Sequence, residues 1–373
     1  MKIGINRENA PGENRVAASP DLVSKLVSSG HDVAVQSGAG ASAGFPDATY
    51  EETGASLGDS ASSIAESSDL LLHVGRPSDK EIDAMQIGSA LAATLDARRD
   101  AEAIEALANA GVTALAMDLV PRIARAQSMD VLSSQASIAG YKAALMAANA
   151  LSRFFPMMMT AAGTIPPARV LILGAGVAGL QAIATAKRLG ADVYAFDVRA
   201  AAGEQVESLG AKFIAPPDAA DAETEGGYAR AQTDDENERQ RSFLADHVVR
   251  ADAVITTAAI PGRQAPLLIE TDTVAEMRPG SIIIDLAAET GGNVEATVAG
   301  EDVHVNGVTV KGPVNVPSLM PYHASVTYAR NLESLLNLII GEDLSLTLDF
   351  DDEVVDAMCV THDGEIRGHT INR

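Results

Sequence analysis

Short apolar or β-branched runs alternate with helical patterns through the first third of the chain. The strand-like runs are KIGI, DVAVQSG, LLLHVG and TALAMD. Between the first two, SPDLVSKLVSSG has the apolar spacing of a helix, with Ser19 as its N-cap, Pro20 at its first position and Gly30 where the helix would end. Strands that alternate with helices predict a parallel, doubly wound sheet.

A second alternation of this kind follows a long helical pattern. Small and apolar residues recur at helical spacing from Met129 to Phe155 without an internal proline, which predicts a helix long enough to bridge two domains. After TIPPA, the strand-like runs are RVLIL, ADVYAFD, AKFIA, ADAVITTA, SIIIDLA and VTVKG. The polar segment from Pro216 to Gln240 has little periodicity, and we predict a long loop there.

The C-terminal part of the chain begins with a further helical pattern, YHASVTYARNLESLLNLII. LSLTLDF and MCVTHDGEIRG then read as strands, and Asp363-Gly364 marks a hairpin turn in the second of them. We expect this part to return to the first domain. The predicted division is a discontinuous domain of residues 1–128 and 325–373, and a second domain of residues 129–324 that includes the linking helix.

Length and charge narrow the class of protein. A chain of 373 residues allows two or three domains that each bury a core. The 27 Lys and Arg against 51 Asp and Glu leave a formal net charge of −24, which repels nucleic acids and anionic lipid surfaces. Because the acidic residues are spread over the whole chain, we interpret them as a solvated surface adapted to high salt. An ordinary acidic enzyme surface is the alternative.

Cysteine, histidine and hydrophobic runs bear on three further features. Cys359 is the single cysteine, so no disulfide can form within the chain, and we expect a buried, inert thiol that suits a reducing cytosol. The 7 histidines have no metal-ligand spacing, and we expect no metal. The sequence has neither a signal-peptide pattern nor a run of 18 apolar residues, so we expect no membrane span.

A glycine motif points to a nucleotide. VLILGAGVAGLQA places Gly174, Gly176 and Gly179 in G-x-G-x-x-G spacing between a strand and a helix. In a dinucleotide-binding turn, the first glycine makes the tight turn, the second leaves room for a pyrophosphate at the helix N-terminus, and the third lets the helix pack closely on the strand. Val177 and Ala178 lie inside this motif and are predicted to contact the cofactor. A purely structural glycine turn is the alternative.

Asp197 ends the next strand, about 20 residues after the glycines. A carboxylate there can accept hydrogen bonds from the adenosine ribose and would repel a 2′-phosphate, which favours NAD(H) over NADP(H). Val198 and Arg199 follow and are included in the predicted cofactor site, although an arginine could also meet a phosphate. Together with the two alternations, the motif predicts an α/β protein of two doubly wound Rossmann-like domains, with a nucleotide cleft between them.

Small or polar residues follow two later strands of the second domain. Thr256, Thr257 and Ala258 come after DAVI, where small side chains would let a ribose and a pyrophosphate approach; core packing is the alternative. Asp285 and Leu286 come after SIII, and ligands of doubly wound sheets lie at the carboxyl ends of strands. Thr257, Ala258 and Leu286 are predicted to contact the cofactor. Asp285 could lie near it, or could instead cap the next turn.

Five segments carry a resemblance to a known family: IGINRENAPGENRVAASPDLV, MDLVPRIARAQSMDVLSSQASIAGYKA, ILGAGVAGLQAIATAKRLGA, TTAAIPGRQAPLLI and IIIDLAAETGGN. Over nearly its whole length, the chain resembles the NAD(H)-binding component, domain I, of proton-translocating nicotinamide nucleotide transhydrogenase. The resemblance implies NAD(H) as cofactor and direct hydride transfer to NADP⁺ on a partner subunit. It also implies a homodimer, with membrane-spanning and NADP(H)-binding subunits that place the chain at the inner face of the cell membrane.

The same resemblance assigns roles to polar residues just before the linking helix. The family's nicotinamide-holding loop matches Arg122, Gln127, Asp130 and Ser133, and the first two would also face the second nucleotide. Hydride transfer from ring to ring needs orientation, at a separation on the order of 3–3.5 Å, rather than acid-base groups. A capped helix start with solvated charges is the alternative.

EGGYAR resembles the tip of the family's mobile loop, which closes over the bound nucleotide. The resemblance implies that Tyr228 would cover the nucleotide and that Gly226 and Gly227 would supply the hinge. This segment is unusually acidic for a loop over a phosphate-bearing ligand. A disordered surface loop is the alternative.

Alanine dehydrogenase shares this fold and is the more distant resemblance. It needs an arginine for the substrate carboxylate, together with acid-base groups. Arg15 matches the arginine, but Gly75 and Asp96 stand where that family has its lysine and histidine, and Glu289 stands where it has its aspartate. These departures favour the transhydrogenase component. An alanine-dehydrogenase-like enzyme and a non-catalytic NAD(H)-binding regulatory module remain the alternatives.

Overall fold

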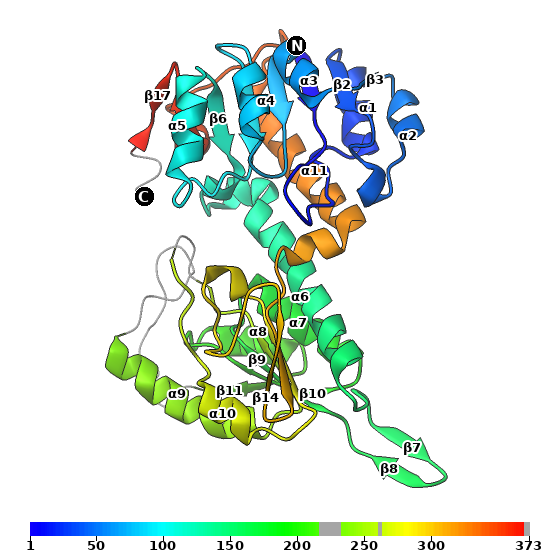
Figure 1. Ribbon diagram of the computed structural model, residues 1–373, viewed down its shortest axis with the longest axis vertical. Helices are drawn as coiled ribbons and strands as arrows, with labels where there is room; N and C mark the ends of the chain where they lie inside the picture. The colour runs from blue at the N-terminus through cyan, green and yellow to red at the C-terminus, as the bar shows by residue number, and fades with distance from the viewer. Residues whose placement is uncertain (216–232, 260–262, 369–373) are drawn as a thin grey trace. The chain divides into compact units, whose positions relative to one another are not determined.

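The computed structural model describes the chain apart from residues 216–232, 260–262 and 369–373. It divides into two compact units: unit 1 comprises Met1–Gln135 and Pro317–Arg373, and unit 2 comprises Ala136–Val316. The division falls inside the long helix α6 (Val131–Ala150). Each unit has a mainly parallel sheet covered by helices (Figure 1), so the predicted class of two doubly wound, Rossmann-like α/β units is confirmed.

Within the described residues, unit 1 contains an 8-stranded sheet of order β17-β16-β6-β5-β4-β1-β2-β3. Its strands are β1 (Lys2–Ile5), β2 (Asp32–Gln36), β3 (Ser56–Gly58), β4 (Leu70–Leu72), β5 (Ala90–Ala93), β6 (Thr113–Ala116), β16 (Cys359–His362) and β17 (Glu365–Ile366). β1 to β6 run parallel, whereas β16 pairs with β6 in the antiparallel sense and turns back into β17. The sheet grows outward from β1 in both directions.

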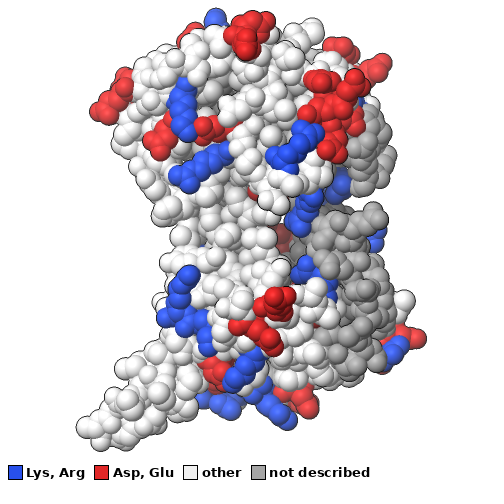
Figure 2. All heavy atoms as spheres, turned by 180° about the vertical axis from the view of Figure 1, so that it is seen from behind, with Lys and Arg blue, Asp and Glu red and all other residues white. Residues whose placement is uncertain are grey.

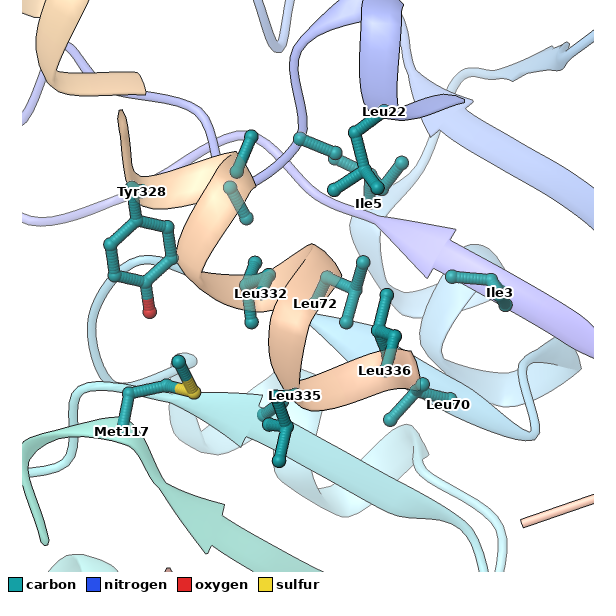
Figure 3. Packing of buried hydrophobic residues seen from close by; sticks show 14 of the residues in the cluster. Ile3, Ile5, Leu22, Leu70, Leu72, Met117, Tyr328, Leu332, Leu335 and Leu336 are labelled. Atoms are coloured by element: carbon teal, nitrogen blue, oxygen red, sulfur yellow. The ribbon is translucent and has the colours of Figure 1, made fainter. Parts of the chain in front are cut away.

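Helices cover both faces of this sheet. They are α1 (Pro20–Ser28), α2 (Asp47–Glu51), α3 (Ala61–Ser67), α4 (Asp79–Ala84), α5 (Ala101–Asn109), α11 (Pro321–Ile339) and α12 (Glu353–Met358), with 3₁₀ turns η1 (Ala41–Ala43), η2 (Met117–Leu119), η3 (Ala124–Met129) and η5 (Val316–Leu319). Leu70 and Leu72 face a core shared with α1, α11 and α12, while Leu71 faces α3, α4 and α5. Figure 3 shows α11 laying Leu332 and Leu336 among Ile3, Leu70 and Leu72. This alternation follows from the two-residue period of a strand.

Unit 2 contains, among its described residues, a 7-stranded sheet of order β11-β10-β9-β12-β13-β15-β14. The strands are β9 (Arg169–Leu173), β10 (Asp192–Phe196), β11 (Lys212–Ile214), β12 (Ala253–Thr256), β13 (Ile282–Asp285), β14 (Asp302–Val305) and β15 (Val308–Lys311). β14 is antiparallel to β15, and the other pairs are parallel. This sheet also grows outward from its first strand, β9.

Two helical layers enclose the second sheet. α6, α7 (Val177–Arg188) and α8 (Ala202–Ser208) pack on one face, and α9 (Asp234–Val249) and α10 (Thr271–Glu276) pack on the other; η4 (Ala288–Thr290) follows β13. A separate hairpin of β7 (Met158–Thr160) and β8 (Gly163–Ile165) projects from unit 2 (Figure 1). Its side chains are exposed along both strands.

Several local predictions are confirmed. α1 follows Ser19 and begins at Pro20, and Gly30 lies just beyond the helix with a φ of +95°. Asp363 and Gly364 both have positive φ and join β16 to β17 as a tight hairpin. Cys359 is buried, and burial raises the pKa of its thiol to about 11. An unreactive thiol follows from that shift.

Three predicted boundaries are wrong. The long helix runs from Val131 to Ala150 and so ends five residues before Phe155. LSLTLDF forms no strand beyond a single bridge between Leu346 and Ile340, because the chain turns at Leu344, where φ is +61°. Its alternate apolar residues pack against the core instead of pairing in a sheet.

The predicted loop from Pro216 to Gln240 is also too long at its C-terminal end. α9 begins at Asp234, and residues 216–232 lie outside the described part of the chain. The first turns of α9 are polar and hold no apolar spacing, whereas Leu244 and Val248 farther along bury their side chains against the sheet. Tertiary packing of the later turns thus stabilises a helix that the sequence pattern does not reveal.

Candidate functional site

The topology of unit 2 singles out the carboxyl ends of β9 and β12. The chain proceeds from β9 to β10 and β11 on one side, then crosses back to β12 and β13 on the other. In doubly wound sheets, ligands bind at this reversal point. Gly174 directly follows β9 and Thr257 directly follows β12, so the glycine motif lies at the reversal.

Each glycine of the motif occupies a different environment. Gly174 has a φ of +98°, a conformation that side chains disfavour. A Cβ on Gly179 would overlap the carbonyl oxygen of Gly174, so only glycine lets α7 start this close to the strand. Gly176, by contrast, has open space where its Cβ would lie. The backbone beside Gly176 is therefore accessible to a ligand.

The N-terminus of α7 has no side-chain cap. Gly176 is the N-cap residue and supplies no acceptor for the first N–H groups of the helix. Val177 is exposed and Ala178 is half-buried, so the first turn presents small groups and backbone donors. Gly140 of α6 lies against the carbonyl of Ala178, where a Cβ would collide with it. The positive end of α7 is thus open to an anion.

Asp197 is buried beside this turn and is already fully bonded. Its Oδ2 accepts hydrogen bonds from the Ala175 backbone N–H (2.7 Å) and from Nη2 of Arg199 (2.8 Å). Its Oδ1 accepts from the backbone N–H (2.9 Å) and Nε (2.8 Å) of Arg199. An ionised carboxylate has about four acceptor positions. A ribose hydroxyl that bonds to Asp197 must therefore displace one of the Arg199 contacts.

A buried polar hub shapes the chain after β12 and β13. Asp285 is fully buried and accepts hydrogen bonds from the hydroxyls of Thr256 (2.8 Å) and Thr297 (2.7 Å). It also accepts from the backbone N–H groups of residues 287, 293 and 294. Of the two roles considered for Asp285, the structure shows the structural one: it caps the turn after β13. The backbone N–H of Leu286 donates to the carbonyl of Thr256 (3.0 Å).

Asn293 is a residue that the sequence reasoning did not single out. Its buried amide accepts from the backbone N–H of Ala258 (3.1 Å) and donates to the Ala258 carbonyl (2.8 Å) and to the Pro266 carbonyl (2.8 Å). Thr257 in turn donates its hydroxyl to the Gly174 carbonyl (3.1 Å). The segment after β12 is thereby held against the glycine turn. Asn293 ends the motif DLAAETGGN, which was the available signal.

The segment before α6 lies in unit 1. Arg122 and Gln127 are exposed on the short turns there, while Asp130 and Ser133 are half-buried. The Asp130 carboxylate accepts from the backbone N–H (2.9 Å) and the hydroxyl (2.6 Å) of Ser133, and so caps α6. Arg125 forms a two-pronged ion pair with Asp352 (2.8 Å for each bond).

The residues that match the alanine dehydrogenase machinery are also in described parts of the structure. The Arg15 guanidinium donates to both carboxylate oxygens of Glu13 (2.8 and 2.6 Å) and to the Gln135 side chain (2.9 Å). Asp96 and Glu289 are exposed. Arg15 is therefore part of a polar network built by this chain.

A second polar cluster fills the reversal point of unit 1, between β1 and β4. His73 is fully buried; its Nδ1 lies 3.0 Å from Glu8 and its Nε2 lies 3.5 Å from Glu81. Burial alone would lower the His73 pKa, but the negative charge of Glu8 and hydrogen bonds to both carboxylates raise it to about 10. Burial raises the Glu81 pKa, but bonds from His73 and Ser78 outweigh it and lower that pKa to about 2. The cluster is a charged histidine between two carboxylates.

Some predictions and features fall outside what can be located. Gly227 and Tyr228, predicted to close over the nucleotide, lie outside the described residues. In the part of the chain that is described, no set of three or more His, Cys, Asp or Glu side chains is arranged to hold a metal ion. Nor does any described helix combine the length and apolar character needed to cross a membrane.

Comparisons with known proteins match both halves of the chain. Residues 4–139 match the alanine dehydrogenase/PNT N-terminal domain, and residues 143–369 match the alanine dehydrogenase/PNT C-terminal domain. An NAD(P) transhydrogenase alpha subunit of Rhodospirillum rubrum is 47% identical over 374 residues, covering 98% of this chain and 97% of the relative. Alanine dehydrogenase of Bacillus subtilis is 30% identical over 337 residues, covering 87% and 82%.

Solved structures agree with this order of similarity. A transhydrogenase from Sinorhizobium meliloti aligns with a TM-score of 0.86 at 45% identity, covering 98% of this chain and 99% of the other. An L-alanine dehydrogenase aligns with a TM-score of 0.82 at 26% identity, covering 98% and 97%. Both predicted resemblances are confirmed, and in the predicted order. The chain belongs to the alanine dehydrogenase/PNT family.

Proposed function

We propose that this chain is the NAD(H)-binding component of a proton-translocating transhydrogenase, and that it passes a hydride between NADH and NADP⁺ held on a partner subunit. The greater similarity to transhydrogenase alpha subunits than to alanine dehydrogenases supports this choice. Bound NADH supplies the hydride. The task of the chain is to hold the nicotinamide in the orientation that transfer requires.

The open glycine turn after β9 is the observation that carries the proposal. An uncapped helix N-terminus with free space beside Gly176 suits a pyrophosphate. Asp197 at the end of the next strand suits the adenosine ribose of NAD(H) rather than a 2′-phosphate. The remaining proposed cofactor contacts surround this turn: Gly174, Val177, Ala178, Gly179, Val198, Arg199, Thr257, Ala258 and Leu286. Gly227 and Tyr228 complete the proposed set from the segment that is not described.

For the nicotinamide half, we assign the segment that carries Arg122, Gln127, Asp130 and Ser133. Amide, hydroxyl and carboxylate groups can hold a carboxamide in one rotation by several hydrogen bonds. No proton is exchanged with a substrate in ring-to-ring hydride transfer, so these groups need only position the ring. The engagement of Arg15 by Glu13 favours this reaction over one that requires an arginine for a substrate carboxylate.

Partners follow from the same proposal. Membrane-spanning and NADP(H)-binding subunits would hold the chain at the inner face of the cell membrane, where proton translocation takes place. A homodimer has structural support in the β7–β8 hairpin, which presents Met157, Met159 and Ile165 to solvent. The segment 154–168 carries no charge, and the hairpin is uniformly white in Figure 2. On an acidic protein, which we propose is adapted to high salt, such a surface suits contact with a second copy.

Two variants of the nicotinamide segment test this function. Asp130→Asn and Gln127→Ala should slow hydride transfer by about 10- to 100-fold while NADH affinity stays within a few-fold, because they disturb ring orientation more than binding. Asparagine caps helices as well as aspartate does, so Asp130→Asn leaves α6 capped. The measurement is the rate of reduction of an NAD⁺ analogue by NADPH, with an NADP(H)-binding partner subunit present. Unchanged rates in both variants would contradict the assignment.

A control assay separates the two alternatives. The purified chain alone, in molar KCl, is given NADH with pyruvate and ammonium while NADH binding is confirmed by titration in the same buffer. Turnover would make the chain an amino acid dehydrogenase and overturn the proposal. Binding of NADH without transfer, even when the NADP(H)-binding partner is present, would indicate a regulatory module.

A further inference from the structure

Asn331 of α11 holds both ends of the segment that carries Asp130 and Ser133. Its Nδ2 donates to the Ser128 carbonyl (2.7 Å), and its Oδ1 accepts from the Ser134 hydroxyl (2.7 Å). About 200 residues of chain separate these partners, as the spacings of 203 and 197 positions show. One amide therefore fixes the span within which Asp130 and Ser133 lie.

The environment of Asn331 favours a specific role for its amide. The residue is 7% exposed, and its helix neighbours Tyr328, Leu332 and Leu335 belong to the hydrophobic core (Figure 3). A buried amide is costly unless its donor and acceptor are both bonded. Packing alone would be served by an apolar residue of similar size. The amide is thus best explained by the two bonds that it makes to the segment.

A second amide extends the same support. The Gln135 side chain donates to the Ala324 carbonyl (3.2 Å) and to the Thr327 hydroxyl (3.2 Å), both on α11. Its Oε1 accepts from Arg15, which Glu13 holds in place. The first turn of α6 is therefore anchored to α11 on the same side as Ser134. Helix α11 acts as a fixed frame for the segment.

We propose that Asn331 is a positioning residue for hydride transfer: it acts through Ser128 and Ser134 to set the orientation of Asp130 and Ser133 toward the nicotinamide. This inference rests on the proposed function. It places a determinant of the reaction in the C-terminal part of the chain, on a residue that does not itself touch the cofactor. Small displacements are enough, because misplacing a reacting group by about 1 Å can slow a reaction on the order of 100-fold.

The test uses Asn331→Asp, which keeps the size of the side chain and the acceptor for Ser134 but replaces the donor to the Ser128 carbonyl with a second oxygen. With the NADP(H)-binding partner present, hydride transfer should fall by about 10- to 100-fold. Affinity for ADP-ribose, which lacks the nicotinamide, should stay unchanged. Asn337→Asp is the matched control, since Asn337 lies on the same helix and is exposed; it should behave as the unaltered chain does.

Two results would overturn the inference while leaving the proposed function intact: full transfer rates in Asn331→Asp, or equal losses of transfer and of ADP-ribose affinity. Absence of transfer in the unaltered chain with its partner would overturn the proposed function, and this inference with it. If Asn331→Asp does not fold, Ser134→Ala removes one of the two bonds at an exchangeable hydroxyl. That variant should show a smaller loss of transfer with unchanged ADP-ribose affinity, and full activity would again overturn the inference.

Discussion

The two units of this protein share one topology but use its reversal point differently. In unit 2, the ends of β9 and β12 carry glycine, threonine and alanine, and space remains beside Gly176. In unit 1, the ends of β1 and β4 carry Asn6, Glu8 and His73, all of them buried. The same point of the fold is open in one unit and filled with side chains in the other.

The filled reversal point contains an internal anion. The Glu8 carboxylate accepts from the backbone N–H groups of Val74 (2.7 Å) and Gly75 (3.2 Å), just after β4. These are the kind of donors that bind a phosphate in an open turn. The comparison shows that topology places donor groups at a reversal point, whereas the local residues decide whether a ligand or the protein itself satisfies them.

The largest expected effect comes from emptying the filled site. His73→Ala leaves Glu8 and Glu81 buried without a cation, and breaking such a buried ion cluster costs about 3–5 kcal/mol. The free energy of unfolding of unit 1, measured with urea, should fall by that amount, while NADH affinity measured on the folded protein stays the same. His323→Ala, at an exposed histidine of the same unit, is the control. A loss of less than about 1 kcal/mol would mean that the cluster contributes little.

Alkaline pH should weaken the same cluster without a mutation. Because the His73 pKa is raised in the folded state, its stabilisation is fully present below pH 6.5 and is lost as the pH rises toward that raised pKa. The slope is about 1.4 kcal/mol per pH unit for one proton. Unfolding of unit 1 followed from pH 7 upward should show this slope in the unaltered protein, and a slope shallower by this amount in His73→Gln. Equal slopes would show that His73 is neutral in the fold.

In the open site, Gly179→Ala should damage the fold. The added Cβ meets the backbone carbonyl of Gly174, which cannot move aside as a side chain would. Overpacking of this kind costs roughly 1–3 kcal/mol. Thermal unfolding of unit 2 should begin at a lower temperature, with unit 1 unaffected. An unchanged unfolding temperature would mean that the turn has room that the structure does not show.

Gly176→Ala should have the smallest effect on the fold and a selective effect on binding. Gly176 has a φ of −75° and open space at its Cβ position, so alanine fits without strain. NADH affinity should fall about tenfold, equivalent to ~1.4 kcal/mol, because the methyl group takes the space offered to the pyrophosphate. Fluorescence titration with NADH measures this directly. Unaltered affinity together with unaltered stability would remove the nucleotide from this turn.

Much of the fold and part of the candidate site were readable in the sequence because they depend on neighbours along the chain. The strand, the glycine turn and the start of α7 occupy 173–179, and the Asp363-Gly364 hairpin spans a few residues. Patterns failed where distant packing decides the outcome. LSLTLDF alternates like a strand but packs on the core without a sheet partner, and α9 begins in a stretch with no apolar spacing.

By itself, the sequence determined the two α/β alternations, the glycine turn and the excess of acidic charge, since each follows from residues that are local or simply counted. Only the tertiary structure decided that Arg199 occupies Asp197, that Asn293 clamps Ala258, and that Asn331 spans Ser128 and Ser134. It also filled one reversal point with Glu8 and His73 while leaving the other open. Such contacts depend on strand order and helix placement, which bring together groups that no spacing along the chain relates.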